Sequence, residues 1–384
     1  MNSISRRHFL TTASATALLL SLEPLIARPN NQRTLFIIEL AGGNDTLNTF
    51  IPYHDRNYQQ LRPSLAINDG IPVSDQVAFH PALKDWKPLL DQGQMAIIQN
   101  VGYPNFSLSH FRAKDIWQSA TPQGSADSGW LGRYLESTKA EGMDAIFLGE
   151  EYPLALMGKH ARYLQLSPRL SVQASGKLGQ AIQMMYNAPQ TNPLAEKVRQ
   201  SVLANQKAIA NLTQDWKGRN NFSNYPQNRT GQQMALVSRI IAARPAVIYL
   251  TIGGWDTHAN QARRHQLLLE QLSSSVSALY RDLQSRGLDK QVLTLIQTEF
   301  GRRPAQNGSG GTDHGTAGSI VAIGGNVKGG FYGGQPALDS LVNGNLPMQV
   351  DFRAVYGEVI SKWLKGNPQT VLEQVFPPIG FITG

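Results

Sequence analysis

Residues 34–45 read Thr-Leu-Phe-Ile-Ile-Glu-Leu-Ala-Gly-Gly-Asn-Asp, and this stretch decides the fold class. Residues 34–40 form a short apolar run rich in β-branched side chains, typical of a strand buried on both faces of a parallel sheet. The two glycines that follow allow a sharp turn, so Asn44 and Asp45 are expected at the carboxyl end of that strand. Asp45 can equally cap a following helix, as Asn and Asp often do.

The rest of the chain alternates short apolar runs with amphipathic segments, which predicts an α/β fold with a doubly wound, mostly parallel sheet. The expected strands are residues 95–101, 145–148, 246–252, 291–298 and 319–323. The expected helices are residues 80–91, 109–119, 232–243, 258–284 and 352–364. Between about 155 and 232 the composition shifts to Gln, Asn, Ser and Ala, with a long helix expected near 193–216. We therefore predict a single domain over residues 28–384 with a helical insertion at about 155–232.

The N-terminal residues indicate where the protein works. Residues 5–10, Ser-Arg-Arg-His-Phe-Leu, precede a small-residue stretch and a short apolar run at 17–22, which is the pattern of a twin-arginine export signal. The apolar run is much shorter than the roughly 18 residues of a membrane span. We expect a twin-arginine signal peptide at residues 1–27, export by the twin-arginine machinery, no transmembrane span, and a periplasmic or secreted protein. The cleavage site is poorly defined, so retention as an N-terminal anchor stays open.

Composition narrows the chemistry available to the chain. Its 384 residues include 35 Lys and Arg against 27 Asp and Glu, a net charge of +8, and no Cys. The lack of cysteine excludes disulfides, thiolate zinc sites, iron–sulfur clusters and cysteine nucleophiles. A bound metal must therefore use imidazole, carboxylate, hydroxyl or carbonyl ligands. The basic residues form no dense block, so nucleic acid is not an expected partner, and the mild positive charge favours a small anionic molecule or an anionic envelope surface.

Polar clusters follow most of the predicted strands, at the edge where a doubly wound sheet places its ligand site. After the strand at 95–101 come Ser107, Ser109 and His110, at the expected start of a helix. The unpaired N–H groups of a helix start favour an anion or a developing alkoxide, although both serines are also ordinary helix caps. His110 next to them makes this stretch a candidate for catalysis as well as for capping.

Two further clusters carry carboxylate, imidazole and guanidinium groups. The motif Gly-Gly-Trp-Asp-Thr-His at 253–258 places Asp256 and His258 two residues apart, so that both can reach one divalent ion. The alternative is an Asp cap beside an exposed His. Glu299 stands where the next strand ends, and Arg302 close behind it can hold an anionic substrate or be solvated.

Asp313 and His314 lie in a glycine-rich loop that leads into the last predicted strand. The acids and imidazoles at the strand ends are Asp45, His110, Asp256, His258, Glu299, Asp313 and His314. Such a set suits a divalent metal, either Zn, Mn, Mg or Ca. A metal-free hydrolase that uses Ser109, His314 and Asp313 or Asp256 is less favoured, because the chain has no Gly-x-Ser-x-Gly elbow.

Motifs spread over nearly all of the mature chain carry a family resemblance. In order they include AGGNDTLNTFIPY, LRPSLAI, FHPALKDWKPLLDQGQMAIIQNVGYPN, SLSHFRAKDIW, GWLGRYL, GGWDTH, TEFGRRPAQNGSGGTDHG and DFRAVYGEVISKWL. This order resembles the bacterial exported family of unknown function numbered 1501. That family looks like a branch of the alkaline-phosphatase-like superfamily, which includes sulfatases and phosphatases. The resemblance implies two-metal chemistry at a phosphate or sulfate ester, with a Ser or Thr nucleophile.

The resemblance also implies roles for individual residues. The implied metal ligands are Asp45, Asp256, His258, Glu299 and His314, and the implied nucleophile is Ser109 or Ser107. The candidate substrate contacts are Asn44, Arg302 and Asp313. Three departures from the superfamily pattern stand out: the Asp256/His258 pair is spaced by two residues rather than four, Phe300 replaces an expected metal His, and two serines compete as nucleophile. One metal site can therefore be lost or altered, with His110 as a substitute catalytic or metal-binding group.

Two functions follow as expectations. The first is a periplasmic metal-dependent hydrolase with a small anionic phosphate or sulfate ester as its substrate. The second is a non-catalytic envelope protein that keeps the fold with a degenerate metal site and binds a ligand or partner. Phe300 at an expected ligand position and the Gln- and Asn-rich insertion favour the second function.

Overall fold

The computed structural model describes residues 33–383 except 124–125, 139–143, 152, 162, 167–187 and most of 190–223. The signal peptide predicted at 1–27 and most of the long helix expected near 193–216 lie outside the described residues. Among the described helices, none combines the length and the apolar character needed to cross a membrane.

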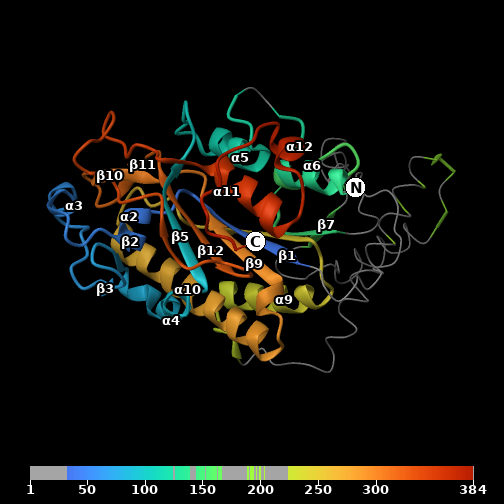
Figure 1. The fold of residues 1–384 in the computed structure, drawn as a ribbon, viewed down its shortest axis with the longest axis horizontal. Helices are drawn as coiled ribbons and strands as arrows, with labels where there is room; N and C mark the ends of the chain where they lie inside the picture. The colour runs from blue at the N-terminus through green and yellow to red at the C-terminus, as the bar shows by residue number, and fades with distance from the viewer. Residues whose placement is uncertain are drawn as a thin grey trace, which may run out of the picture.

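A nine-stranded sheet runs through the middle of the molecule (Figure 1). Its strands lie in the order β13-β5-β12-β9-β1-β8-β6-β7, with β14 paired to β5. They are β1 (Thr34–Ala41), β5 (Met95–Gly102), β6 (Ala145–Leu148), β7 (Tyr163–Leu166), β8 (Val247–Gly253), β9 (Val292–Gln297), β12 (Gly318–Gly324), β13 (Gly330–Tyr332) and β14 (Val350–Asp351). Every neighbouring pair is parallel except that β12 runs antiparallel to both β9 and β5. The predicted mostly parallel α/β sheet is confirmed.

Strand β1 lies inside the sheet because both of its faces are apolar. Phe36 and Ile38 pack into the core on one face, and Leu35 and Ile37 pack into the core on the other. All four side chains are completely buried. Successive side chains of a strand point to opposite faces, so a continuous apolar run requires cover on both sides.

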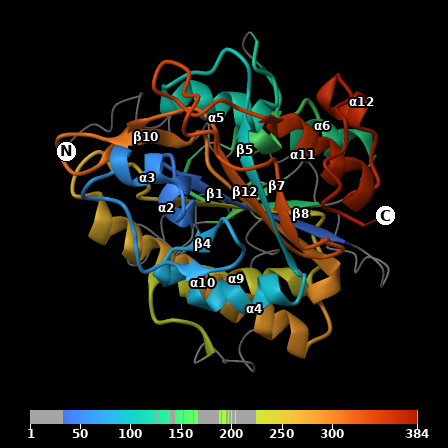
Figure 2. The same cartoon turned by 60° about the vertical axis from the view of Figure 1, so that its left-hand side comes forward.

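Helices cover both faces of the sheet (Figures 1 and 2). One face packs against α4 (Lys87–Asp91), α9 (Arg229–Ala242) and α10 (Gln261–Ser285). The other packs against α5 (His110–Ser119), α6 (Trp130–Ser137), α11 (Phe352–Glu358) and α12 (Pro368–Leu372). Two helical layers around one sheet are the doubly wound arrangement that the alternation of strands and helices predicts.

Two expected helices are broken into shorter pieces. Residues 80–91 form a 3-10 segment, Pro81–Trp86, which is followed by α4. Pro88 in the first turn of α4 has no N–H to donate, so it starts a new helix rather than continuing the preceding one. Residues 352–364 form α11 and then a turn of π-helix at Val359–Trp363.

The region expected as a helical insertion, about 155–232, contributes a strand to the main sheet. Strand β7 pairs in parallel with β6 and forms one edge of the sheet. Its side chains alternate between buried and half-buried positions, as they do in a strand with one covered face. Most of the remainder of this region lies outside the described residues.

The carboxyl ends of β1, β5, β8 and β9 meet at one edge of the sheet, and the antiparallel β12 begins there. A short helix, α2 (Thr46–Thr49), follows β1 at this edge, and a hairpin of β10 (Arg302–Gln306) and β11 (Thr312–His314) connects β9 to β12. Smaller elements beyond α2 are β2 (Phe50–Ile51), α3 (Arg56–Leu61), β3 (Ile71–Pro72) and β4 (Ala78–Phe79). The predicted site residues all lie at this edge, in the loops after the strands, at the start of α5 or in the β10–β11 hairpin.

Candidate metal centre

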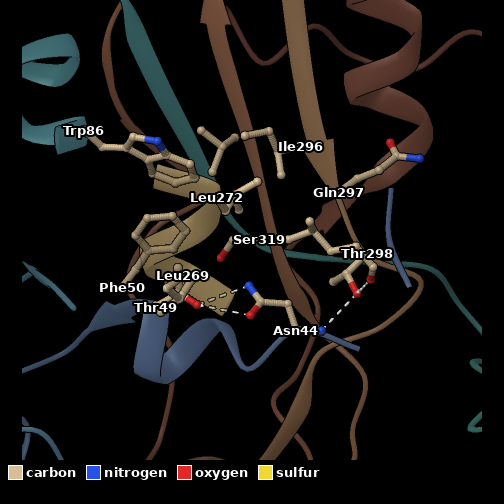
Figure 3. A pocket seen from close by; sticks show the side chains of 12 residues that line it. Asn44, Thr49, Phe50, Trp86, Leu269, Leu272, Ile296, Gln297, Thr298 and Ser319 are labelled. Atoms are coloured by element: carbon tan, nitrogen blue, oxygen red, sulfur yellow. Dashed lines mark hydrogen bonds between the residues drawn. The ribbon is translucent and has the colours of Figure 1, made fainter. Parts of the chain in front are cut away.

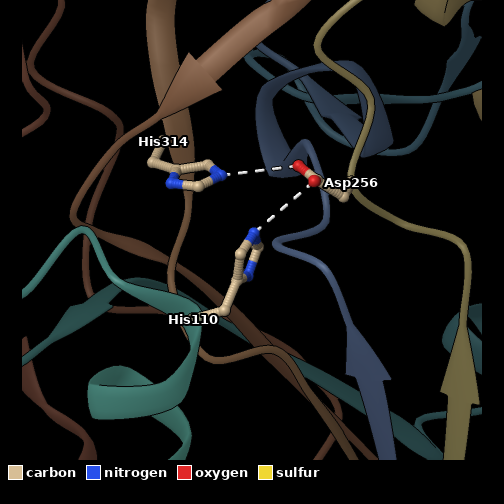
Figure 4. A group of neighbouring side chains, drawn as sticks. All are labelled: His110, Asp256 and His314. Carbon is tan, nitrogen blue, oxygen red and sulfur yellow. Dashed lines mark hydrogen bonds and ion pairs between the residues drawn. The ribbon is translucent and has the colours of Figure 1, made fainter.

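Four of the predicted site residues converge at this edge of the sheet. His110 is the first residue of α5, Asp256 lies three residues beyond β8, and His314 ends β11 (Figure 4). One ligand atom from each of these three lies within 4.8 Å of the other two. His258 joins them, with its Nε2 3.2 Å from Asp256 Oδ1 and 2.9 Å from His314 Nε2. We call these four residues the His/Asp cluster.

The Nδ1 atom of each imidazole in the cluster is held by an oxygen. The pairs are His110 with Glu299 Oε1 at 2.8 Å, His314 with the Leu108 carbonyl oxygen at 2.7 Å, and His258 with Asp313 Oδ1 at 3.2 Å. Carboxylate and carbonyl oxygens only accept, so each Nδ1 is assigned as the N–H donor. The three Nε2 atoms then carry lone pairs. Imidazoles oriented in this way by an outer oxygen are typical of metal ligands.

Two features of the Nε2 atoms fit a cation among them. His258 Nε2 and His314 Nε2 are 2.9 Å apart, so two lone pairs face each other unless a proton or a metal ion lies between them. His110 Nε2 is buried without a hydrogen bond in the described part of the chain, and it lies 3.6 Å from Asp256 Oδ2. An unsatisfied buried polar atom costs about 1–3 kcal/mol. Three imidazoles and one carboxylate suit Zn or another transition metal better than Mg or Ca, which prefer oxygen ligands.

Burial and neighbouring charges set the protonation of the cluster. Burial lowers the pKa of His314, which favours the neutral imidazole that a metal requires. The hydrogen bond to Glu299 raises the pKa of His110, so this ring holds a proton more readily when no cation is bound. Partial burial alone would raise the pKa of Asp256, but the hydrogen bond and charge of Arg302 lower it overall. The carboxylate of the cluster is therefore ionised at neutral pH.

Arg302 corrects both expectations for its role, because it is neither solvated nor placed to bind a substrate. Its side chain is buried, and all three of its nitrogens donate to protein oxygens. Nε bonds the Gly43 carbonyl and Nη1 the Thr312 carbonyl, each at 2.7 Å, while Nη2 bonds the Gly42 carbonyl and, at 2.6 Å, Asp256 Oδ1. The guanidinium thus clamps the loops after β1 and β8 to the hairpin and fixes the carboxylate of the cluster.

Glycines allow these loops to approach closely. A Cβ atom on Gly42 would lie 2.3 Å from the backbone nitrogen of Asp256, and the φ angle of Gly42 is +127°. A Cβ atom on Gly311 would lie 2.3 Å from the carbonyl carbon of His258. The glycine turn predicted after β1 therefore serves two needs, a backbone conformation that other residues rarely adopt and a contact without room for a side chain.

Glu299 and Phe300 follow β9 and support the cluster from outside it. Besides His110, the buried Glu299 carboxylate accepts a hydrogen bond from the Gly42 backbone N–H at 2.8 Å. The Phe300 ring lies 4.9 Å from the ring of His110 and 4.6 Å from that of His314, measured between centroids. Phe300, which replaces an expected metal His, thus packs on two imidazoles. Glu299, which was expected as a metal ligand, contacts the cluster only through His110 Nδ1.

Asp45 and Asn44 lie in a separate buried polar network beside α2. Asp45 caps α2, and its Oδ2 accepts from Arg62 Nη1 at 2.6 Å and from Gln261 Nε2 at 2.5 Å. Asn44 Oδ1 accepts from His265 Nε2 at 2.8 Å, and burial lowers the pKa of His265 to about 4, so this imidazole is neutral. The structure therefore shows Asp45 as a helix cap and ion-pair partner, and it does not bring Asp45 into the His/Asp cluster.

A small cavity lies next to Asn44, beneath the site edge (Figure 3). Its volume of about 10 Å³ has space for one water molecule. Phe50 and Trp86 line it on the apolar side, while Asn44 donates from its side chain to Thr49 Oγ1 and from its backbone to Thr298 Oγ1. Asn44 thus has its partners within the protein, and the cavity is far too small for an ester substrate.

The two candidate nucleophiles stand on the loop that leads into α5. Ser109 occupies the N-cap position, but its side chain makes no capping hydrogen bond, and the residue is exposed. Ser107 Oγ accepts from the backbone N–H of Ser109 at 3.2 Å. Ser109 directly precedes His110 of the cluster, so both serines stay candidates and Ser109 lies nearer to the cluster along the chain.

Asn307 contributes to the site although nothing in the sequence singles it out. Its Nδ2 donates to Asp313 Oδ1 at 3.0 Å and to the His258 carbonyl oxygen at 2.9 Å. The hydrogen bond from Asn307 lowers the pKa of Asp313, which keeps that carboxylate ionised beside His258. Asp313, expected to contact a substrate, therefore contacts His258 and Asn307. An Asn next to glycines is an ordinary turn residue, so only its contacts identify it.

Several solved structures are partly similar to this chain. A protein of the alkaline phosphatase superfamily from Vibrio parahaemolyticus is 9% identical, with 86% of this chain and 71% of that chain covered and a TM-score of 0.35. The C-terminal periplasmic domain of EcEptC from Escherichia coli, in complex with Zn, is 8% identical, with 79% and 77% covered and a TM-score of 0.34. The lipoteichoic acid synthase LtaP from Listeria monocytogenes is 6% identical, with 84% and 73% covered and a TM-score of 0.37.

Sequence comparison identifies a family. No curated protein matches the chain. The family described as protein of unknown function (DUF1501) matches residues 92–346, which is more than half of the chain. The matched span contains all four residues of the His/Asp cluster. This protein therefore belongs to the DUF1501 family, as its motifs predict.

Proposed function

We propose that this protein is a metal-dependent hydrolase of phosphate or sulfate esters, with the His/Asp cluster as its metal centre. The observation that supports the proposal most strongly is the convergence of three imidazoles on one carboxylate, with every Nδ1 bonded to an oxygen acceptor. The resemblance of the sequence motifs to the alkaline-phosphatase-like superfamily supplies the reaction class. An anionic ester is therefore the proposed substrate.

A divalent metal is the proposed cofactor. His110, Asp256 and His314 are the proposed ligands, with His258 as a fourth. Three nitrogen ligands favour Zn among the four ions that the sequence suggests. When bound, such an ion polarises the ester oxygens and shares the negative charge of the transferred group.

Ser109 is the proposed nucleophile, with Ser107 as the alternative. The Ser109 hydroxyl is not used to cap α5, and it directly precedes a proposed ligand. The N–H groups at the start of the ten-residue α5 favour negative charge in this position. Asn44 and Arg302 are left out of the proposed substrate site, because their polar groups are bonded within the protein.

We also propose that the protein works in the periplasm or as a secreted protein. Arg6 and Arg7, followed by a short apolar run at 17–22, support export by the twin-arginine machinery. That pathway carries proteins already folded, so a metal centre built from distant loops can form before export.

The second candidate function is a non-catalytic envelope protein that binds a ligand or partner at a degenerate metal site. Asp45 favours it, because this implied metal ligand in the loop after β1 is instead paired with Arg62. Phe300 favours it as well, because an apolar ring fills the place of an implied ligand. Turnover of an ester by the purified protein decides between the two functions.

The hydrolase proposal is tested with metal analysis and two ester substrates. We expect the purified protein to hold about one Zn per chain and to hydrolyse an aryl phosphate or an aryl sulfate. His110→Ala and His314→Ala remove ligands, so each should lose the metal and lower kcat/KM by roughly 100-fold or more. His54→Ala, which changes an exposed histidine outside the cluster, should keep both metal and activity.

Metal removal gives a second readout that does not require turnover. Binding to the native state alone stabilises it by about 2.7 kcal/mol when the metal concentration is 100 times its Kd. A chelator should therefore lower the midpoint of thermal unfolding, and added Zn should restore it in the parent but not in His110→Ala. Metal-free protein that hydrolyses neither ester after reconstitution with Zn, Mn, Mg or Ca would exclude the hydrolase. Bound metal without any turnover would favour the binding protein.

A further inference from the structure

We infer that the substrate is an amphipathic ester, with its anionic head on the His/Asp cluster and its apolar chain on a neighbouring patch of exposed hydrophobic side chains. The patch consists of Phe106, Leu108 and Phe111, and we call it the apolar lip. The inference rests on the proposed function for the position of the head group. It adds the class of molecule that carries the ester.

The apolar lip is a concentration of side chains that a soluble surface rarely exposes together. Within the part of the chain that the structure describes, seven large hydrophobic side chains are exposed, and three of them fall within residues 106–111. Phe111 is 86% exposed, Phe106 43% and Leu108 37%. Single exposed apolar residues are normal, whereas a group of them marks an interaction site. We therefore expect these three side chains to contact a ligand or a partner.

The lip and the His/Asp cluster share one stretch of the chain. His110 lies between Leu108 and Phe111 in the sequence, and the Leu108 carbonyl accepts the hydrogen bond from His314 Nδ1. One six-residue stretch thus supplies a proposed ligand, orients a second and exposes three apolar side chains. Consecutive Cα atoms are about 3.8 Å apart, so Phe111 starts one residue step from a ligand. An alkyl chain that extends from a head group at the cluster along residues 106–111 would contact the lip.

These apolar side chains are not needed for the core. Helix α5 buries Ala113, Ile116 and Trp117 against the sheet. Phe111 precedes Ala113 by two positions, or about 200° around a helix, so it projects from the opposite face. The buried face of α5 is therefore complete without Phe111. The exposed Phe111 side chain is available to contact a molecule outside the fold.

Charge points to an amphipathic molecule rather than to a fully polar one. A divalent ion held by the His/Asp cluster would attract an anionic head group. The adjoining residues 103–111 contain no Lys, Arg, Asp or Glu. A sulfated or phosphorylated sugar would leave this uncharged surface exposed to water, whereas an alkyl chain buries it. The burial of each CH₂ group is favourable, so a chain of several carbons is recognised.

Binding of two phosphonates that differ only in chain length tests the inference. Methyl phosphonate and dodecyl phosphonate, the latter below its micelle concentration, are titrated calorimetrically into the Zn-loaded protein. We expect dodecyl phosphonate to bind at least about tenfold more tightly. In Phe106→Ser/Phe111→Ser the ratio of the two affinities should fall about tenfold. Val375→Ser, which removes a 63%-exposed apolar side chain elsewhere, should leave the ratio unchanged.

Three outcomes overturn the inference. The first is equal affinity of the parent protein for the two phosphonates, and the second is a chain-length preference that survives in the double variant. The third is sedimentation of the protein with phosphatidylglycerol vesicles that depends on both Phe side chains, although the two monomeric phosphonates bind equally. The last outcome identifies the lip as a membrane-docking surface. Turnover of aryl esters without chain-length preference overturns this inference but supports the proposed hydrolase. A Phe-dependent chain-length preference without any ester turnover would show an amphipathic ligand at the lip but no substrate, and it would favour the binding protein over the hydrolase.

Discussion

Glu299 sets the orientation of His110 at the scale of single residues. Its carboxylate lies 2.8 Å from His110 Nδ1 and 2.8 Å from the backbone nitrogen of Gly42. The side chain is buried, so these contacts are not weakened by water. A fixed Nδ1–H leaves the Nε2 lone pair available to a metal. Glu299 is therefore a positioning residue for the proposed centre.

We expect Glu299→Ala to lower the affinity for Zn by about 10- to 100-fold, the usual effect of losing an outer hydrogen-bond partner of a metal-bound His. Glu299→Gln keeps the length of the side chain and an acceptor oxygen, so it should recover part of that loss. Competition with a chromophoric chelator measures the affinities. Glu270→Gln, on the exposed face of α10, is the control. Equal Zn affinity in the parent and in Glu299→Ala would contradict the positioning role.

Tight turns control the site at the scale of elements. The loop after β1 touches the loop after β8 at Gly42, where a Cβ atom would lie 2.3 Å from the Asp256 nitrogen. Arg302 locks the same contact by bonding the Gly42 carbonyl and Asp256 Oδ1. The position of the carboxylate in the cluster therefore depends on the packing of two backbone segments as well as on its own side chain.

We expect Gly42→Ala to destabilise the protein by about 3 kcal/mol or more, because it combines an unfavourable φ angle with a backbone clash. It should also weaken Zn binding, since the loop that carries Asp256 must move. Gly287→Ala is the matched control, because the φ angle of Gly287 is +65° but no atom lies within 4 Å of the added Cβ. We expect it to lower the free energy of unfolding by about 1–2 kcal/mol. Denaturant unfolding measures the loss of stability in both variants. Equal losses in the two variants would show that the contact at Gly42 is not tight.

The cluster forms only in the folded molecule. His110 and Glu299 are 189 positions apart in the sequence, and Arg302 lies 260 positions from Gly42. The sheet brings these segments together because β1, β5, β8 and β9 end at the same edge. A partly unfolded chain would therefore lack the proposed metal centre, whereas the proposed export of the folded chain would preserve it.

The export proposal is tested by exchanging the paired arginines. Arg6→Lys/Arg7→Lys keeps the charge of the N-terminus but removes the twin-arginine pair. In a bacterial host we expect the variant to stay in the cytoplasmic fraction, while the parent moves to the periplasm or medium. His8→Ala, adjacent to the pair, serves as the control. Unchanged export of the double variant would exclude the twin-arginine route.

The sequence by itself determined the fold class and the edge that carries the site. The apolar run of β1 and the runs at 95–101 and 246–252 match observed strands to within one or two residues. These patterns are local, because burial on both faces requires a continuous apolar segment wherever the strand occurs. The glycine turns after β1 and β8 are also local patterns, and they correctly predicted which edge of the sheet carries the candidate site.

Only the tertiary structure decided what each polar side chain does there. Sequence position puts Asp45, Glu299 and Arg302 at one edge with the four residues of the His/Asp cluster. The fold pairs Asp45 with Arg62, turns Glu299 to the outer nitrogen of His110, and buries Arg302 as a clamp. Each of these three contacts involves a partner from a distant segment of the chain. Hydrophobic periodicity predicts whether a segment is buried, but it does not predict which segments lie next to it. The direction of a polar side chain is set by those neighbours, so it emerges only when the loops pack.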